Sequence, residues 1–265
     1  MSLTRKRILD EMGLSPQWIL RVRPKPMGDS PCAETVQTEA SQSPVLPGAA
    51  PTAASAEEMA RTDNKHDVLA KVMDMDWPQL QQTIMDCHLC GLCARRKQAV
   101  PGVGDEQADW LFIGEGPGAE EDARGEPFVG QAGRLLDAML AAIDLARGKN
   151  VYIANAVKCR PPGNRTPELS EMAACRPYLQ RQIELLQPKL IVLLGKAAVA
   201  AVLGEERSLA SMRGRPLIYR QGELEIPTLV TYHPAYLLRN LPDKAKAWED
   251  LCRARALMQC IVNTP

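Results

Sequence analysis

Two separated pairs of cysteines could hold a metal through their thiolates. Cys87 and Cys90 form a C-x-x-C motif, and Cys159 and Cys175 follow far downstream with fifteen residues between them. The motif alone is shared by zinc knuckles, redox sites and iron–sulfur clusters, and the distant second pair strengthens the case for a metal. A cluster held by four thiolates fits the pattern, although the spacing by itself does not exclude zinc.

A fifth cysteine, Cys93, leaves the choice of ligands open. It lies three residues after Cys90, as in the run of cysteines that begins a bacterial ferredoxin motif. The fourth cysteine of that motif is missing, because Lys97 occupies its position and no proline follows. The ferredoxin interpretation therefore fails, and Cys93 stays an additional thiol beside the candidate site.

A glycine-rich, acidic loop could bind a small neutral ligand. Residues 114–118 read Gly-Glu-Gly-Pro-Gly, and Glu115, Glu121 and Asp122 crowd the loop. The segment matches neither G-x-x-x-x-G-K-[ST] nor G-x-G-x-x-G, so it is not a recognised phosphate cradle. Its acids would repel a phosphate without a metal, but they suit polar contacts with a neutral base and the stabilisation of a cationic sugar. The alternative is a flexible turn, although Phe128, one of only two phenylalanines, lies close by.

Two polar residues, Asn155 and His233, come at or just after the ends of apolar runs. The amide of Asn155 offers a donor and an acceptor, which match O4 and N3–H of uracil. The alternative for Asn155 is a cap at the end of a strand. His233 precedes Pro234, which favours an extended backbone that holds the ring near the strand end, although a lone histidine is more often structural.

Basic and apolar residues near these positions are candidates for contact with DNA. Lys158, Arg160 and Arg165 occur with no acid between them and are plausible phosphate contacts. Leu237 and Arg239 combine an apolar side chain with a cation, which suits a wedge inserted into a base stack beside a phosphate. The alternatives are solvated surface charges and a hydrophobic loop packed against the last helix.

Strand and helix patterns alternate through the second part of the chain. Apolar runs predict strands at residues 110–113, 151–153, 190–194 and 226–232, and periodicity predicts helices at 132–143, 168–186, 196–203 and 244–262. This alternation indicates a mostly parallel sheet covered on both faces, with ligands bound beyond the carboxyl ends of its strands. The glycine loop, Asn155 and His233 are therefore expected on one rim.

Composition divides the 265 residues into three segments. Residues 1–26 are interpreted as a basic helical arm, and residues 27–64, rich in Pro, Ala, Ser, Thr and Gln, as a disordered linker. Residues 65–265 have the size of a single catalytic domain. The arm is interpreted as a solvated segment, with a peptide that docks a partner or tracks along DNA as the alternative.

Charge and hydropathy narrow the functional classes. The formal net charge is +0, so no overall field attracts nucleic acid and DNA binding requires a local basic face. No secretory signal or membrane-length apolar stretch is apparent, which predicts a cytosolic protein without membrane contact. In that compartment cysteines are more often metal ligands, reactive thiols or core residues than disulfides.

Together these motifs resemble the family 4 uracil-DNA glycosylases, the iron–sulfur branch of the uracil-DNA glycosylase superfamily. The resemblance covers about residues 80–255. It rests on Cys87-x-x-Cys90, the glycine loop at 114–118, Glu121-Asp122, Pro127-Phe128-Val129-Gly130, the Asn-Ala-Val-Lys-Cys-Arg-Pro-Pro segment at 155–162, Cys175 and His233-Pro234-Ala235. It implies an α/β fold of three layers, in which helices flank a four-stranded, mostly parallel sheet.

The resemblance also implies a cofactor and a base-binding site. A 4Fe-4S cluster would sit on Cys87, Cys90, Cys159 and Cys175 and would be structural. Phe128 would stack on a flipped uracil, Asn155 would read its Watson–Crick edge, and backbone amides near Gly116 would contact the base. Glu121 would crowd C5 and exclude the methyl group of thymine, and His233 would stabilise negative charge on O2 of the leaving uracil.

The group that activates water is not assigned by the resemblance, because Gly116 occupies the position where better-known uracil glycosylases have an aspartate. Glu115 is the first candidate for this role and Asp122 the second.

The implied function is a DNA repair glycosylase that flips uracil out of single- or double-stranded DNA. It would hydrolyse the N-glycosidic bond, leave an abasic site and act as a monomer. One alternative is a superfamily member that binds DNA or a partner protein without efficient excision. Another is a zinc-stabilised interaction module that docks a partner, such as a repair protein, through the N-terminal arm.

Overall fold

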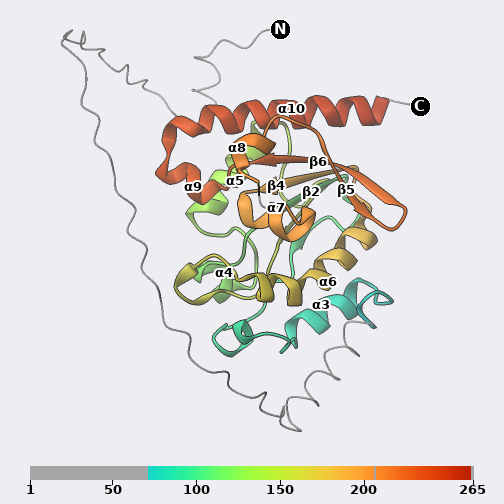
Figure 1. The fold of residues 1–265 in the computed structure, drawn as a ribbon, viewed down its shortest axis with the longest axis vertical. Helices are drawn as coiled ribbons and strands as arrows, with labels where there is room; N and C mark the ends of the chain where they lie inside the picture. The colour runs from blue at the N-terminus through green and yellow to red at the C-terminus, as the bar shows by residue number, and fades with distance from the viewer. Residues whose placement is uncertain (1–70, 206, 264–265) are drawn as a thin grey trace, which may run out of the picture.

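The structure of the protein, a computed structural model, describes residues 71–263 with the exception of residue 206. The predicted arm at 1–26, the predicted linker at 27–64 and the predicted start of the domain at residue 65 lie outside the described residues. The described part is an α/β arrangement of three layers, with helices on both faces of one sheet (Figure 1).

The sheet has six strands in the order β1-β3-β2-β4-β6-β5. Its strands are β1 (Val103–Gly104), β2 (Trp110–Gly114), β3 (Val151–Asn155), β4 (Leu190–Leu194), β5 (Leu217–Gln221) and β6 (Leu224–Thr231). The four central strands β3, β2, β4 and β6 are parallel, whereas β1 and β5 pair in antiparallel fashion at the two edges.

The predicted sheet of four strands is corrected to six. The four predicted strands are the parallel centre, where β2, β3 and β4 are buried along their whole length and read as continuous apolar runs. The two edge strands gave no such signal in the sequence. β1 has only two residues, and β5 buries only Tyr219.

The four predicted helices are confirmed to within about two residues at each end. The helices of the described part are α3 (Trp77–Met85), α4 (Ala119–Arg124), α5 (Gln131–Ala141), α6 (Leu169–Leu186), α7 (Lys196–Leu203), α8 (Leu209–Met212), α9 (Pro234–Arg239) and α10 (Lys244–Asn263). Short 3₁₀ turns are η1 (Gly91–Ala94), η2 (Pro162–Asn164) and η3 (Leu241–Asp243). Among these helices, none is both long enough and apolar enough to cross a membrane.

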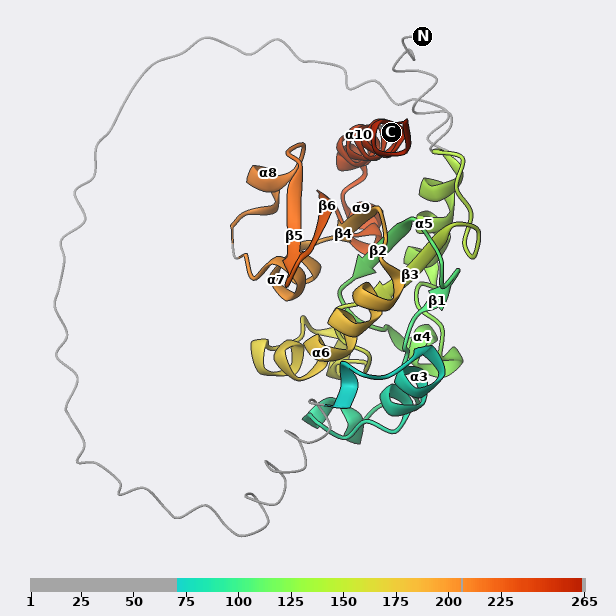
Figure 2. The same ribbon diagram turned by 90° about the vertical axis from the view of Figure 1, so that its right-hand side faces the viewer.

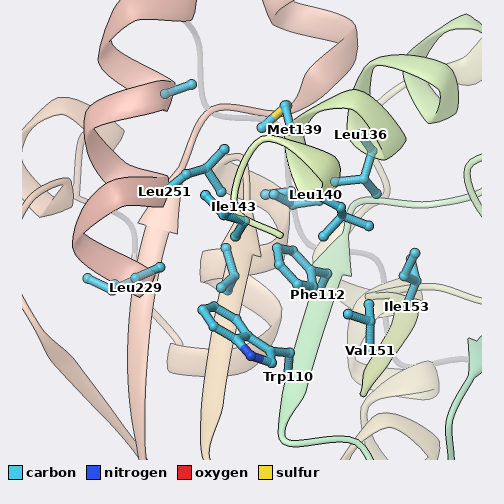
Figure 3. Packing of buried hydrophobic residues seen from close by; sticks show 14 of the residues in the cluster. Trp110, Phe112, Leu136, Met139, Leu140, Ile143, Val151, Ile153, Leu229 and Leu251 are labelled. Carbon is cyan, nitrogen blue, oxygen red and sulfur yellow. The ribbon is translucent and has the colours of Figure 1, made fainter. Parts of the chain in front are cut away.

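Alternation along the central strands divides the core between the two faces of the sheet. Trp110 and Phe112 pack with α5 and α10, where they meet residues such as Leu251 (Figure 3). Leu111 and Ile113 point the other way, toward α6 and α7. Figure 2 shows α10 and α6 on opposite sides of the sheet. The sheet is therefore held rigidly from both sides, which fixes the position of its strand ends.

The register of the parallel strands brings distant residues together at their carboxyl ends. Gly114, the last residue of β2, lies beside Asn155, the last residue of β3. Leu194 of β4 pairs with Thr231 of β6, and His233 follows two residues later. The segments that follow β2, β3, β4 and β6 therefore begin along the same edge.

Candidate active site and candidate metal centre

A pocket of about 610 Å³ lies at the carboxyl ends of the parallel strands. Each central strand contributes to it: Glu115 follows β2, Asn155 ends β3, Gly195 follows β4 and His233 follows β6. The predicted convergence of the glycine loop, Asn155 and His233 on one rim is confirmed. Phe128 and Glu121, from the segment between β2 and α5, also line the pocket.

Asn155 presents a buried polar group to this pocket. Its side chain is 2% exposed, and its Oδ1 has no hydrogen-bond partner among the described residues. A buried acceptor without a partner is costly, so the site is suited to a ligand that donates to it. Gly114 leaves the space that this amide occupies, because a Cβ there would lie 2.5 Å from Asn155 Oδ1 and 2.5 Å from Phe128 Cζ.

Phe128 is held in an uncommon backbone conformation beside His233. Its φ is 57°, in the left-handed region that costs energy for a bulky residue. The two ring centroids are 5.4 Å apart at an interplanar angle of 32°. Arg147 stabilises this turn, since its Nη2 donates to the Phe128 carbonyl at 2.8 Å and its Nη1 donates to the Pro127 carbonyl at 2.8 Å. The ring is thereby positioned before any ligand binds.

Glu121 joins the two segments that carry the glycine loop and Phe128. Its Oε1 accepts from the backbone amides of Val129 and Gly130 at 3.0 and 3.1 Å, and its Oε2 accepts from Gly118 N at 3.1 Å. The predicted role of Glu121 at C5 of the base stays a prediction. Its contacts establish that the carboxylate also fixes the shape of the pocket wall.

His233 lines the pocket as a neutral imidazole with a defined tautomer. Its Nδ1 accepts from Ala235 N at 3.2 Å as the N-cap of α9, so the ring proton lies on Nε2. Burial and, to a smaller extent, the charge of Arg239 lower the pKa of His233 to about 4, against an opposite effect of Glu121. The histidine can therefore donate a hydrogen bond while it remains uncharged at neutral pH.

The two candidates for water activation lie in different places. Glu115 is half-buried on the pocket wall, where burial raises its pKa above the usual range despite a hydrogen bond with the Thr166 side chain. Asp122 is only 2% exposed, is absent from the pocket lining and accepts from Lys97 N at 2.9 Å. The prediction that Asp122 serves as a catalytic residue does not fit this arrangement, because its carboxylate caps a neighbouring segment instead.

A second, much smaller cavity is lined by five cysteine residues. They are Cys87, Cys90, Cys93, Cys159 and Cys175, all with free thiols. Burial raises the pKa of Cys159 to about 11 and that of Cys175 to about 12. Thiolates in such apolar surroundings need compensating positive charge, and this donor set fits a thiolate-bound metal or cluster.

A cationic side chain, Arg96, lies beside the cysteine cavity. Within residues 71–263, no three His, Cys, Asp or Glu side chains are arranged to hold one metal ion. A cationic donor is nevertheless in place, because Arg96 Nη1 donates to Cys159 Sγ at 2.8 Å and its Nη2 donates to the Met85 carbonyl at 2.7 Å.

The model of the uracil DNA glycosylase superfamily matches residues 101–252. The chain belongs to this superfamily. Curated relatives place it in the type-4 branch. A type-4 uracil-DNA glycosylase of Sulfurisphaera tokodaii is 42% identical over 176 residues, which are 65% of this chain and 80% of the relative. One from Thermotoga maritima is 40% identical over 183 residues, 68% of this chain and 93% of the relative. A type-5 uracil-DNA glycosylase of Thermus thermophilus is 34% identical over 161 residues, which cover 49% of this chain and 73% of the relative.

Two residues expected to contact DNA are buried in this superfamily member. Lys158 is 1% exposed, and its Nζ donates to the Asn155 carbonyl at 3.0 Å and to Gln182 Oε1 at 2.6 Å. Leu237 is 0% exposed within the core beside α10, whereas its neighbour Leu238 is 39% exposed. The predictions of a phosphate contact by Lys158 and a wedge from Leu237 are therefore corrected, and Leu238 is the exposed leucine of this pair.

The three arginines expected to contact DNA lie at or near the pocket rim. Arg239 is exposed and lines the pocket. Arg165 also lines it, but its guanidinium donates to both carboxylate oxygens of Glu171 at 2.8 and 2.7 Å. Arg160 donates to Asn164 Oδ1 at 2.8 Å. All three stay predicted DNA contacts, with Arg165 and Arg160 also shaping the loop that follows β3.

Sequence reasoning missed several residues of the pocket. Lys196 is exposed at the start of α7, and Tyr232 and Tyr236 also line the pocket, with ring centroids 5.0 Å apart. Lys196 and Tyr232 follow strands just as His233 does, and this position could have identified them. Arg147 gave no such signal, because its partners lie in a loop about twenty residues earlier.

Proposed function

We propose that this chain removes uracil from DNA by hydrolysing the N-glycosidic bond, which leaves an abasic site. The observation that carries the proposal is the buried, unpartnered Oδ1 of Asn155 in a pocket that Phe128 and His233 also line. N3–H of uracil supplies the donor that this oxygen lacks, and the amide nitrogen can donate to O4 in return. The relatives of the type-4 branch carry the same activity in their names.

Base selection in this proposal depends on a preformed pocket. The target nucleotide leaves the helix at a cost of a few kcal/mol, which is lowest for a mismatched or single-stranded base. The ring of Phe128 then stacks on the flipped uracil, and backbone amides near Gly116 contact its edge. Glu121 stands where the methyl group of thymine would need space, so uracil is favoured over thymine.

Bond cleavage passes both electrons of the N-glycosidic bond to the departing uracil and leaves a cationic sugar. The Nε2–H of His233 donates to O2, where negative charge develops. The low pKa of this ring suits it to hydrogen bonding as a neutral donor. Preorganised donors of this kind account for about 10²–10³-fold in rate. Water then adds to C1′ of the sugar through its oxygen, and the proton that it loses passes by way of Glu115 to the uracil anion, which leaves as neutral uracil.

We assign Glu115 as the base that activates the attacking water. Its carboxylate lies on the pocket wall and its pKa is raised by burial, which makes it a stronger base than an exposed glutamate. Its negative charge also favours the cationic sugar.

The cysteine cavity is proposed to hold a 4Fe-4S cluster on Cys87, Cys90, Cys159 and Cys175. When bound, the cluster supplies a structural cross-link between the C-x-x-C segment and the segment that follows Asn155. The cavity lined by five thiols supports a cluster held by thiolates. Cys93 lies in the same lining as a fifth thiol and is not needed for a four-thiolate site.

Incubation of the purified protein with a labelled uracil oligonucleotide, followed by alkali, tests the proposed function. Strand breaks are expected at uracil in single-stranded DNA and in U·G and U·A pairs, and none at thymine or cytosine. Binding without breaks would favour the second candidate, a superfamily member that binds DNA without efficient excision.

Replacement of single cysteines tests the cofactor. The wild-type protein and Cys93→Ala are expected to contain iron and to absorb at about 400 nm, whereas Cys159→Ala loses both. Zinc in the wild-type protein, with no visible absorption, would contradict the cluster. Loss of iron in Cys93→Ala with retention in Cys159→Ala would show that Cys93 is the ligand.

The pH dependence of kcat/KM should show no ionisation of histidine near its ordinary pKa. The pKa of His233 is lowered to about 4, so the ring stays neutral as pH falls from 8 to 5. The pKa of Glu115 is raised, so its protonation begins above the usual range of a glutamate and lowers the rate as pH falls. We therefore expect kcat/KM to fall at acidic pH in the wild-type protein and to show no such fall in Glu115→Gln. A step near pH 6.5 that disappears in His233→Asn would contradict it.

Three further predictions concern the oligomeric state, the location and the partners of the protein. A monomeric state, a cytosolic location and docking of a repair protein by residues 1–26 stay predictions.

A further inference from the structure

Lys158 lies between the candidate active site and the cysteine cavity. It follows Asn155 by three residues, precedes Cys159 directly and is among the largest side chains that are fully buried. Lys158 also lines the cysteine cavity. A lysine is almost never fully buried unless it is paired, so this position calls for a specific explanation.

The ammonium of Lys158 joins the end of β3 to helix α6. Its Nζ donates to the Asn155 carbonyl at 3.0 Å and to Gln182 Oε1 at 2.6 Å, and Gln182 Nε2 donates to the Pro101 carbonyl at 2.9 Å. The contact with Asn155 is to the backbone of the residue whose side chain faces the pocket. The position of that amide therefore depends on the position of the lysine.

Among the described residues, which omit Glu206, no carboxylate is paired with Lys158. Both hydrogen-bond acceptors are neutral, and the nearby groups that can carry negative charge are Cys159 and Cys175, which line the same cavity as Lys158. A buried cation without an anionic partner is strongly unfavourable, whereas thiolates of an occupied metal site supply negative charge. The cysteines are thus the natural counter-charge for this ammonium.

We propose that Lys158 is a positioning residue that couples the occupied cysteine site to Asn155. The thiolates hold the ammonium, and the ammonium holds the backbone carbonyl of Asn155, so that the amide is oriented for the base. This inference rests on the proposed function, because it gives Asn155 the task of reading uracil. It assigns the lysine to the interior of the enzyme and not to the DNA surface.

Lys158→Met tests the inference, because methionine fills a similar volume without charge and packs readily in a core. Lys149→Met, an exposed lysine in a loop, is the matched control. Each protein is purified with its iron. Two quantities are measured: the rate of iron loss to a chelator, and affinity for two oligonucleotides. One oligonucleotide carries a fluorinated deoxyuridine that resists cleavage, and the other carries an abasic analogue.

In Lys158→Met we expect faster iron loss together with a weaker preference for the uracil analogue. The loss of one buried hydrogen bond predicts a fall in preference of about 3- to 10-fold. Affinity for the abasic analogue, which does not reach Asn155, should stay unchanged, and Lys149→Met should match the wild-type protein in both measurements.

Three outcomes would overturn the coupling. Unchanged iron retention and preference would mean that Lys158 only fills space. Faster iron loss with intact preference would assign the lysine to the cysteine site alone, and weaker preference with normal iron retention would assign it to Asn155 alone.

If Lys158→Met does not fold, Gln182→Met is the second test, because it removes one anchor of the ammonium and should show smaller changes in both quantities. A Gln182→Met protein identical to wild type would then contradict the inference.

The wild-type protein separates this inference from the proposed function. If it shows no preference for the uracil analogue over the abasic analogue and no excision, the proposed function fails first. If it shows both, the variants report on Lys158 alone.

Discussion

His233→Asn is expected to lower the single-turnover rate of uracil release by about 10²–10³-fold, with DNA affinity nearly unchanged. Asparagine is a good N-cap, so its Oδ1 can replace Nδ1 as the acceptor from Ala235 N and preserve the start of α9. The shorter side chain does not carry a donor to the place that Nε2–H occupies. The variant therefore removes the proposed catalytic contact and keeps the structural one.

His233→Ala is the comparison that decides between these two roles, since it removes both the donor and the cap. If the donor is what matters, both variants lose rate to a similar extent, and both still bind the uncleavable uracil oligonucleotide. If His233→Asn keeps the wild-type rate while His233→Ala loses it, the histidine is only a cap. A loss of binding without a loss of rate at saturation would assign the residue to DNA contact.

The position of the site could be predicted from the sequence because parallel strands impose it. Continuous apolar runs identified the four central strands, and residues at their carboxyl ends must then share an edge. Gly114 and Asn155 are 41 positions apart in the sequence, yet they are neighbours in the register of β2 and β3. That step needed no knowledge of side-chain packing.

The wrong site predictions concern residues whose burial and contacts cannot be inferred from the neighbouring sequence. Lys158 looked like a surface cation in a basic segment, but the acceptor Gln182 on α6 lies 24 residues away and no local pattern reveals it. Leu237 and Leu238 differ only in the phase of a six-residue helix, too short for periodicity to settle which of them is buried. Asp122 was grouped with the loop acids, although the first turn of α4 directs it away from the pocket, toward Lys97 N.

The candidate metal centre shows the same contrast between what spacing in the sequence predicts and what depends on distant residues. Spacing selected Cys87, Cys90, Cys159 and Cys175 and could not decide about Cys93, and all five thiols do line one cavity. The donor from Arg96 to Cys159 was not predicted, since the two residues are 63 positions apart. Sequence patterns thus identify candidate ligands, whereas the groups that stabilise their charge can be identified only from the fold.

Asn155→Asp is expected to reduce uracil excision by about 10⁴-fold, because a site built to hydrogen-bond its substrate is severely impaired when polar groups are left unpaired. An ionised aspartate only accepts hydrogen bonds, so it still meets N3–H but faces the O4 acceptor without a donor. It also introduces a charge at a position that is 2% exposed. The ratio of uracil to cytosine excision should fall with the rate.

Asn164→Asp is the matched control, since Asn164 is an exposed residue on the same pocket rim whose Oδ1 accepts from Arg160. An aspartate there keeps that acceptor, so excision should stay within a few-fold of wild type. Measured kcat/KM for uracil in both variants, with melting temperatures to establish that each protein is folded, separates base reading from general damage. A folded Asn155→Asp protein with normal excision would show that Asn155 only caps the end of β3. Equal losses in the two variants would mean that added negative charge near the DNA, and not base reading, lowers the rate.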